Sequence, residues 1–107
     1  MKERIEVTLG RISSLAKEMT NQDENDQART YATIKVLLDW LFEVNHEYNR
    51  DNSYAREKLT SIEWGVACLA GFEGSSSRDD NIDQLSWLYG DIESAGDELA
   101  LGAIDLY

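Results

Sequence analysis

The sequence predicts an all-α protein, an antiparallel four-helix bundle formed by a single domain that covers residues 1–107. Three observations predict this fold. The chain contains no proline, so the strongest helix breaker is missing. Apolar residues recur three and four positions apart in four segments, which is the spacing of one helix face. The chain is also long enough to enclose one apolar core without disulfides, and its single cysteine, Cys68, has no partner for an internal one.

The first two predicted helices cover residues 2–20 and 27–48. The apolar face of the first consists of Ile5, Leu9, Ile12, Leu15, Ala16 and Met19. A polar run at 21–25 predicts a loop, and Asp26 is expected to cap the second helix. The wide stripe of the second helix contains Ile34, Leu37, Leu38, Leu41 and Tyr48.

The third predicted helix covers residues 54–70, after a turn at 50–53 in which Asn52 or Ser53 is the expected cap. Its apolar line consists of Ala55, Leu59, Ile62, Val66 and Leu69. Residues 71–81 contain two glycines and three serines and predict a loop.

The fourth helix is expected to begin at Asp79 or Asp80. Its apolar residues are Ile82, Leu85, Leu88, Tyr89 and Ile92. Gly96 and Gly102 weaken a continuous helix, so the end stays open. The alternatives for residues 96–107 are a helix, including a short fifth one that would contain Leu99, Ala103 and Leu106, a strand added to a partner, or a flexible tail.

Negative charge is concentrated at the C-terminal end. The chain has a formal net charge of −11, and residues 79–107 contribute eight carboxylates and no Lys or Arg. Such a field repels nucleic acid and anionic membranes and attracts basic surfaces. The ten basic residues are scattered and form no stripe that could neutralise phosphates. We therefore expect a basic protein as partner, with no direct nucleic-acid binding and no membrane contact.

Three tryptophans lie off the apolar faces of the last three predicted helices. At about 100° per residue, Trp40 lies about 100° from the centre of its stripe, and Trp64 and Trp87 lie about 160–180° away. Large aromatic side chains away from the core indicate either a helix that is covered on two sides or an interface. For Trp40 the sequence favours the first alternative, and for Trp64 and Trp87 both stay open.

Trp87 lies within a row of four acids. The row follows helical spacing and contains, in order, Asp80, Asp83, Trp87, Asp91 and Glu98. If the helix continues past Gly96, all five lie on the face opposite Ile82, Leu85 and Ile92, and otherwise Glu98 leaves the set. No Lys or Arg on this helix relieves the repulsion between these carboxylates, which suggests that a partner does so. The alternative is an acidic face that serves solubility alone.

Catalytic and metal-binding chemistry has little support in the sequence. Glu43 and His46 have the Glu-x-x-His spacing of di-iron bundles, but His46 is the only histidine, and both residues lie on the solvent side of their predicted helix. Cys68 has no base assigned to it and is read as a small packing residue. No phosphate-binding or calcium loop is recognisable. We expect no enzyme activity, no cofactor and no metal site.

The leading hypothesis is a small acidic inhibitor that binds the basic, nucleic-acid-binding surface of another protein. Immunity proteins, antitoxins and phage anti-defence proteins use this design, and no motif links the chain to one family. Its carboxylates would stand where phosphates bind, with Trp87 as the buried anchor and Asp80, Asp83, Asp91 and Glu98 around it. A charged start and the lack of a long apolar run predict a cytoplasmic location.

The alternative hypothesis is a helical structural or adaptor module that forms a homodimer. Its interface would contain Trp64, Cys68 and Trp40, and the acidic face would remain in solvent. Salt separates the two hypotheses, because charge pairing weakens as salt rises whereas apolar burial does not.

Overall fold

The described part of the chain folds into four helices that run alternately up and down. The computed structural model describes residues 2–69 and 78–104, with side-chain surroundings for residues 3–69 and 85–99. The helices are α1 (Lys2–Met19), α2 (Glu24–Tyr48), α3 (Ser53–Leu69) and α4 (Arg78–Ile104).

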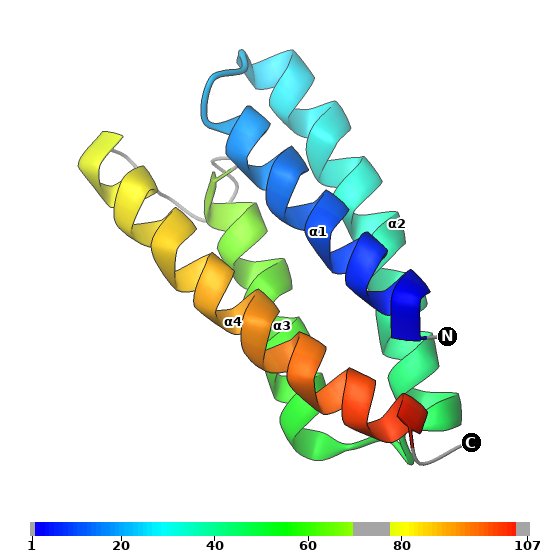
Figure 1. Ribbon diagram of the computed structural model, residues 1–107. Helices are drawn as coiled ribbons and strands as arrows, with labels where there is room; N and C mark the ends of the chain where they lie inside the picture. The colour runs from blue at the N-terminus through cyan, green and yellow to red at the C-terminus, as the bar shows by residue number, and fades with distance from the viewer. Residues whose placement is uncertain (1, 70–77, 105–107) are drawn as a thin grey trace.

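Figure 1 shows the helices as two neighbouring antiparallel pairs, α1 with α2 and α3 with α4. Each helix packs mainly against its two neighbours in the ring, and the contact between α3 and α4 is the most extensive. The molecule measures 44 × 21 × 18 Å, so its length is set by the helices. The predicted all-α bundle is confirmed.

The core contains apolar side chains from all four helices. Its buried residues are Ile5, Leu9, Ile12, Ala16, Met19, Ile34, Leu38, Leu41, Val44, Ala55, Leu59, Ile62, Val66, Leu69, Leu88, Ile92, Ala95 and Leu99. The stripe predicted for α3 is buried throughout. Leu15, Leu37 and Leu85 are partly buried against this core, whereas Tyr48 and Tyr89 are exposed, contrary to their place in the predicted stripes.

The connection between α1 and α2 differs from the prediction. Helix α2 begins at Glu24, three residues earlier than expected, and its N-cap is Asp23 rather than Asp26. The Asp26 backbone N–H donates to Asp23 Oδ1 at 2.9 Å, which satisfies a helix N–H that lacks an intrahelical partner. Gln27 Nε2 also donates to the Met19 carbonyl at 2.9 Å, so the start of α2 is tied to the end of α1.

The turn between α2 and α3 is organised by two asparagines. Ala55 N–H donates to Asn52 Oδ1 at 2.9 Å, so Asn52 is the cap, in agreement with one of the two predicted alternatives. Asn45 is buried, and its Nδ2 donates to the Asn52 carbonyl at 3.1 Å. Arg50 and Asp51 adopt left-handed φ values of 55° and 50° within this turn. Such values are uncommon for residues other than glycine, and the surrounding hydrogen bonds hold them.

Helix α4 begins at Arg78, one residue before the predicted start, and continues without a break through Gly96 to Ile104. The predicted loop was therefore too long at its C-terminal side, and within residues 78–104 no separate fifth helix forms. A Cβ at Gly96 would lie 3.2 Å from Leu9 Cδ1 of α1. The glycine permits α1 and α4 to approach closely, and this packing offsets its low helix propensity. Residues 70–77 and Leu106 lie outside the described residues.

Across residues 2–69 and 78–104, no helix combines the length and the hydropathy that crossing a membrane requires.

Candidate functional site

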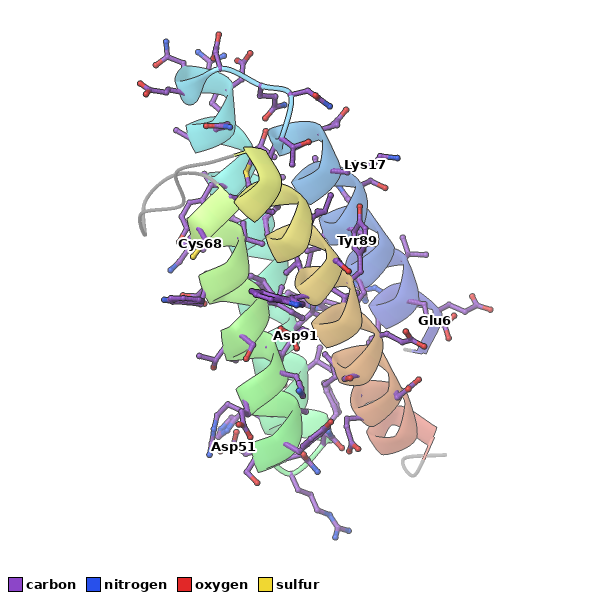
Figure 2. All side chains as sticks on the ribbon, turned by 90° about the vertical axis from the view of Figure 1, so that its left-hand side faces the viewer. Glu6, Lys17, Asp51, Cys68, Tyr89 and Asp91 are labelled. Atoms are coloured by element: carbon purple, nitrogen blue, oxygen red, sulfur yellow. The ribbon has the colours of Figure 1, made fainter. Side chains whose placement is uncertain are left out.

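Two exposed tryptophans from neighbouring helices meet in one groove. Trp64 of α3 is 59% exposed and Trp87 of α4 is 67% exposed. Together with Thr60, Ser61 and Asp91 they line an open groove of about 380 Å³ between α3 and α4. Figure 2 views these two helices side by side and labels Asp91 where α4 borders α3. We call this feature the tryptophan groove.

The position of Trp64 follows from helical periodicity. Trp64 lies two residues after Ile62 and two before Val66, both of which are fully buried. At about 100° per residue it therefore projects away from the core, as the sequence predicted. Thr60 and Ser61 precede it by one helical turn and lie on the same side of α3. That spacing is visible in the sequence and could have identified both residues.

The acidic row of α4 is placed differently from the prediction. Trp87, Asp91 and Glu98 each directly precede a buried residue, so each lies about 100° from the centre of the core and not opposite to it. The reason is the core face of α4. It consists of Leu88, Ile92, Ala95 and Leu99 and is rotated away from the stripe that Ile82 and Leu85 suggested. Trp87 and Asp91 consequently border α3.

Asp91 has an intramolecular cation that the sequence did not reveal. Lys58 Nζ of α3 lies 3.7 Å from Asp91 Oδ1, and both side chains are slightly more than one quarter exposed. The separation exceeds the usual N–H···O hydrogen-bond range, so this is a loose ion pair. Lys58 Nζ also lies 5.5 Å from the centre of the Tyr54 ring. The sequence predicted no basic residue on the helix of the acid row, but α4 begins with Arg78. Beyond Arg78 the helix carries no Lys or Arg, and Lys58 approaches Asp91 from the neighbouring helix.

The remaining predicted acids lie outside the groove lining. Glu98 is half-buried on α4. It lies two turns beyond Asp91, which corresponds to about 10 Å along the helix. Because α4 continues past Gly96, Glu98 stays on the same helix as Trp87 and Asp91. Asp80 and Asp83 belong to the first turns of α4, and their side chains lie outside the described residues.

Trp40 lies on a different flank of the bundle. Its ring packs against the core, and the guanidinium carbon of Arg4 lies 5.1 Å from the ring centre. Helix α1 therefore covers it, which agrees with the interpretation that the sequence favoured for Trp40. Lys35 of α2 instead reaches α3, where its Nζ lies 3.3 Å from Glu63 Oε1. Trp40 follows Lys35 by five residues, about 140° around α2, so Trp40 and Trp64 do not form one patch.

Cys68, the third residue of the predicted dimer interface, is 5% exposed. Its burial agrees with a packing role for a small apolar side chain. Within the described residues, therefore, Trp64 is the exposed member of that set, and it shares its groove with Trp87 of the acidic row.

The Lys35–Glu63 pair is the clearest electrostatic effect in this part of the molecule. The hydrogen bond to Glu63, followed by the charge of that carboxylate, raises the pKa of Lys35 above its ordinary value of 10.5. Glu63 directly precedes Trp64 but pairs with α2. Its charge is thus directed away from the tryptophan groove.

The described side chains do not come together in a metal-binding site. Glu43 and His46 are both exposed on α2, as their distance from the apolar stripe predicted. In residues 3–69 and 85–99, no three His, Cys, Asp or Glu side chains come together in a way that could hold a metal ion.

Comparisons with protein-family models, with curated proteins and with solved structures found no match to this chain.

Proposed function

We propose that this protein is a small inhibitor that binds the basic, nucleic-acid-binding surface of another protein in the cytoplasm, without enzymatic activity of its own. The binding surface comprises α4 and the tryptophan groove. Trp87 is its anchor, Asp91 and Glu98 are the nearby acids, and Asp80 and Asp83 extend the acidic sequence toward the start of the helix.

The observation that carries this proposal is the exposure of Trp87 within an acidic helix. Two thirds of the side chain is exposed, although burying so large a ring would stabilise the protein. Tryptophan and arginine dominate the energetic centres of protein interfaces, which are surrounded by contacts that exclude water. An exposed tryptophan beside carboxylates therefore fits a partner that offers basic side chains.

The charge distribution supports the same conclusion. After Arg78, helix α4 carries carboxylates and no basic residue. A rigid helix with such charges presents a field similar to that of a phosphate backbone. Charge pairing of this kind accelerates encounter and selects the partner, whereas a buried anchor such as Trp87 supplies affinity.

Self-association is the second candidate, because Trp64 is exposed beside Trp87 and a second copy could cover both rings. Two observations favour binding of a basic partner over self-association. The three residues of the predicted dimer interface do not form one exposed patch. In addition, a dimer through the groove would bring two chains of formal charge −11 together at their acidic helices, where like charges repel.

Capture from a host lysate tests the proposed function. The immobilised protein should retain a nucleic-acid-binding protein at low salt and release it near 0.5 M salt, where the screening length is about 4 Å. Trp87→Ala should reduce the affinity for the captured protein by about thirtyfold, the effect of losing roughly 2 kcal/mol at an interface centre.

Two variants of equal charge provide the control. Asp91→Asn with Glu98→Gln should weaken capture, whereas Glu43→Gln with Glu47→Gln, two exposed acids of α2, should leave it nearly unchanged. Equal losses for both pairs would show that net charge alone is responsible. Equal retention by wild type and by Trp87→Ala would contradict the proposal.

A further inference from the structure

We propose that the tryptophan groove binds a single arginine side chain of the basic partner, with the guanidinium group between the Trp64 and Trp87 rings and against the Asp91 carboxylate. This inference rests on the proposed function and specifies the chemistry that the groove recognises. It makes Trp64, Trp87 and Asp91 one binding site that is built from two helices.

The groove is large enough to hold an arginine side chain. Its volume of about 380 Å³ is near the lower end of the roughly 300–1,000 Å³ that ligand sites occupy. Two indole rings and the hydroxyl-bearing side chains of Thr60 and Ser61 form the walls. Thr60 Oγ1 donates to the Arg56 carbonyl at 2.9 Å, so its proton is already used within α3. The groove therefore offers aromatic faces and hydrogen-bond acceptors, which a cationic donor can use.

The Asp91 carboxylate is only loosely paired with Lys58, so it can form a closer ion pair with an incoming cation. Lys58 is 3.7 Å from Asp91, beyond hydrogen-bond distance, and it has a second site over the Tyr54 ring. A guanidinium can donate two parallel hydrogen bonds to a carboxylate at about 2.7–2.9 Å. An incoming arginine would thus replace a loose contact with a bidentate one, and Lys58 would keep its contact with Tyr54.

Arginine fits this site better than lysine. A guanidinium is planar, stacks on aromatic rings and is more weakly hydrated than an ammonium group. Cation–π contact within about 6 Å of a ring centre contributes roughly 0.5–2 kcal/mol. The protein already uses this contact elsewhere, because Arg4 lies over the ring of Trp40. Trp64 and Trp87 lack such a contact within the described residues and are exposed.

The test is a titration with short peptides, followed by NMR of the three tryptophan indole N–H signals. The probes are acetyl-hexa-arginine amide and acetyl-hexa-lysine amide at about 50 mM salt, a condition of weak screening. The signals of Trp64 and Trp87 should shift and that of Trp40 should not. The arginine peptide should bind about tenfold more tightly than the lysine peptide.

Two substitutions should change the affinity for the arginine peptide in opposite directions. Asp91→Asn should weaken it about tenfold by removing the charge-assisted pair, whereas Lys58→Gln should strengthen it, because Asp91 loses its competing cation. Trp64→Leu should remove the preference for arginine. Glu43→Gln on α2 is the control and should leave the preference intact. A mere effect on folding would not produce opposite signs at Asp91 and Lys58.

The outcomes distinguish this inference from the proposed function. If both peptides bind with salt-dependent affinity but Trp64 and Trp87 do not respond, the arginine site is wrong and the basic-partner function stands. If neither peptide binds, both are wrong. If the protein is a dimer in which both indoles are protected, the occupant is a second copy, and the arginine site is again wrong.

Discussion

The tryptophans that lie off the core have different surroundings on the two flanks of the bundle. On the flank formed by α1 and α2, Trp40 packs against the core and lies beneath the guanidinium of Arg4. On the flank formed by α3 and α4, Trp64 and Trp87 line an open groove that contains the carboxylate of Asp91. Within the described residues, a cation lies over the first aromatic surface, whereas the rings of the second are exposed and only the loose Lys58–Asp91 pair borders them. This difference supports the proposal that the second flank binds a cation of a partner.

Both flanks depend on one shared core, so the largest expected effects fall there. Leu41 of α2 and Ile62 of α3 are fully buried. Leu41→Ala and Ile62→Ala should each reduce the free energy of unfolding by about 2–5 kcal/mol, through lost burial and a residual cavity. Urea denaturation measures both values. A cost below about 1 kcal/mol at either position would contradict the packing of α2 against α3.

Alanine substitution of the tryptophans tests the comparison between flanks directly. Trp40→Ala should reduce the free energy of unfolding by about 1–3 kcal/mol, less than for a fully buried ring but enough to reflect its contacts with the core and Arg4. Trp64→Ala and Trp87→Ala should each change it by less than about 0.5 kcal/mol, because their rings are exposed. Thermal and urea unfolding give the values. Equal costs at all three positions would remove the distinction between a structural and a binding flank.

Substitutions of two glycines of α4 test how closely α4 packs against α1. A Cβ at Gly90 would meet nothing within 4 Å, whereas one at Gly96 would lie 3.2 Å from Leu9 Cδ1. Gly90→Ala should therefore stabilise the protein by about 0.5–1 kcal/mol through helix propensity. Gly96→Ala should stabilise it less, or destabilise it, because buried Leu9 must move. The reverse order in urea denaturation would contradict the close approach of α1 and α4.

The smallest expected effect concerns the Lys35–Glu63 ion pair, which joins α2 to α3. Glu63 raises the pKa of Lys35 above 10.5, so the stabilising effect of the pair is complete below that value and is lost as the pH rises through the folded-state pKa. Lys35→Met should lower stability slightly at pH 7, and the difference from wild type should shrink above about pH 11. Unfolding curves at both pH values measure it. A difference that stays constant with pH would show that the pair is not responsible.

Much of the fold could be predicted from the sequence, because apolar periodicity reports directly on burial. The stripe of Ala55, Leu59, Ile62, Val66 and Leu69 corresponds fully to buried residues of α3. The errors fell at helix ends and in α4. Asp23 and Asp26 are equally good caps by residue type, and only the backbone geometry distinguishes them. Gly96 argued for a break because its close contact with α1 is a tertiary feature.

The candidate site could be predicted only in part. Periodicity identified Trp64 and Trp87 as off-core residues, since that information is local to each helix. It placed them in two different hypotheses, because the sequence does not give the register of α3 against α4. For the same reason, the sequence did not show that Lys58 of α3 lies near Asp91 of α4. Contacts within one helix follow from spacing, whereas contacts between helices require the packed structure.

The proposed function requires that the flank formed by α3 and α4 bind a partner surface where nucleic acid would otherwise bind. Competition tests it most directly. The protein captured from lysate is bound to a fluorescent nucleic-acid duplex, and its anisotropy is followed as the acidic protein is added. We predict that wild type displaces the duplex and that Trp87→Ala with Asp91→Asn does so far less well. A stable ternary complex, or equal displacement by both proteins, would contradict the account.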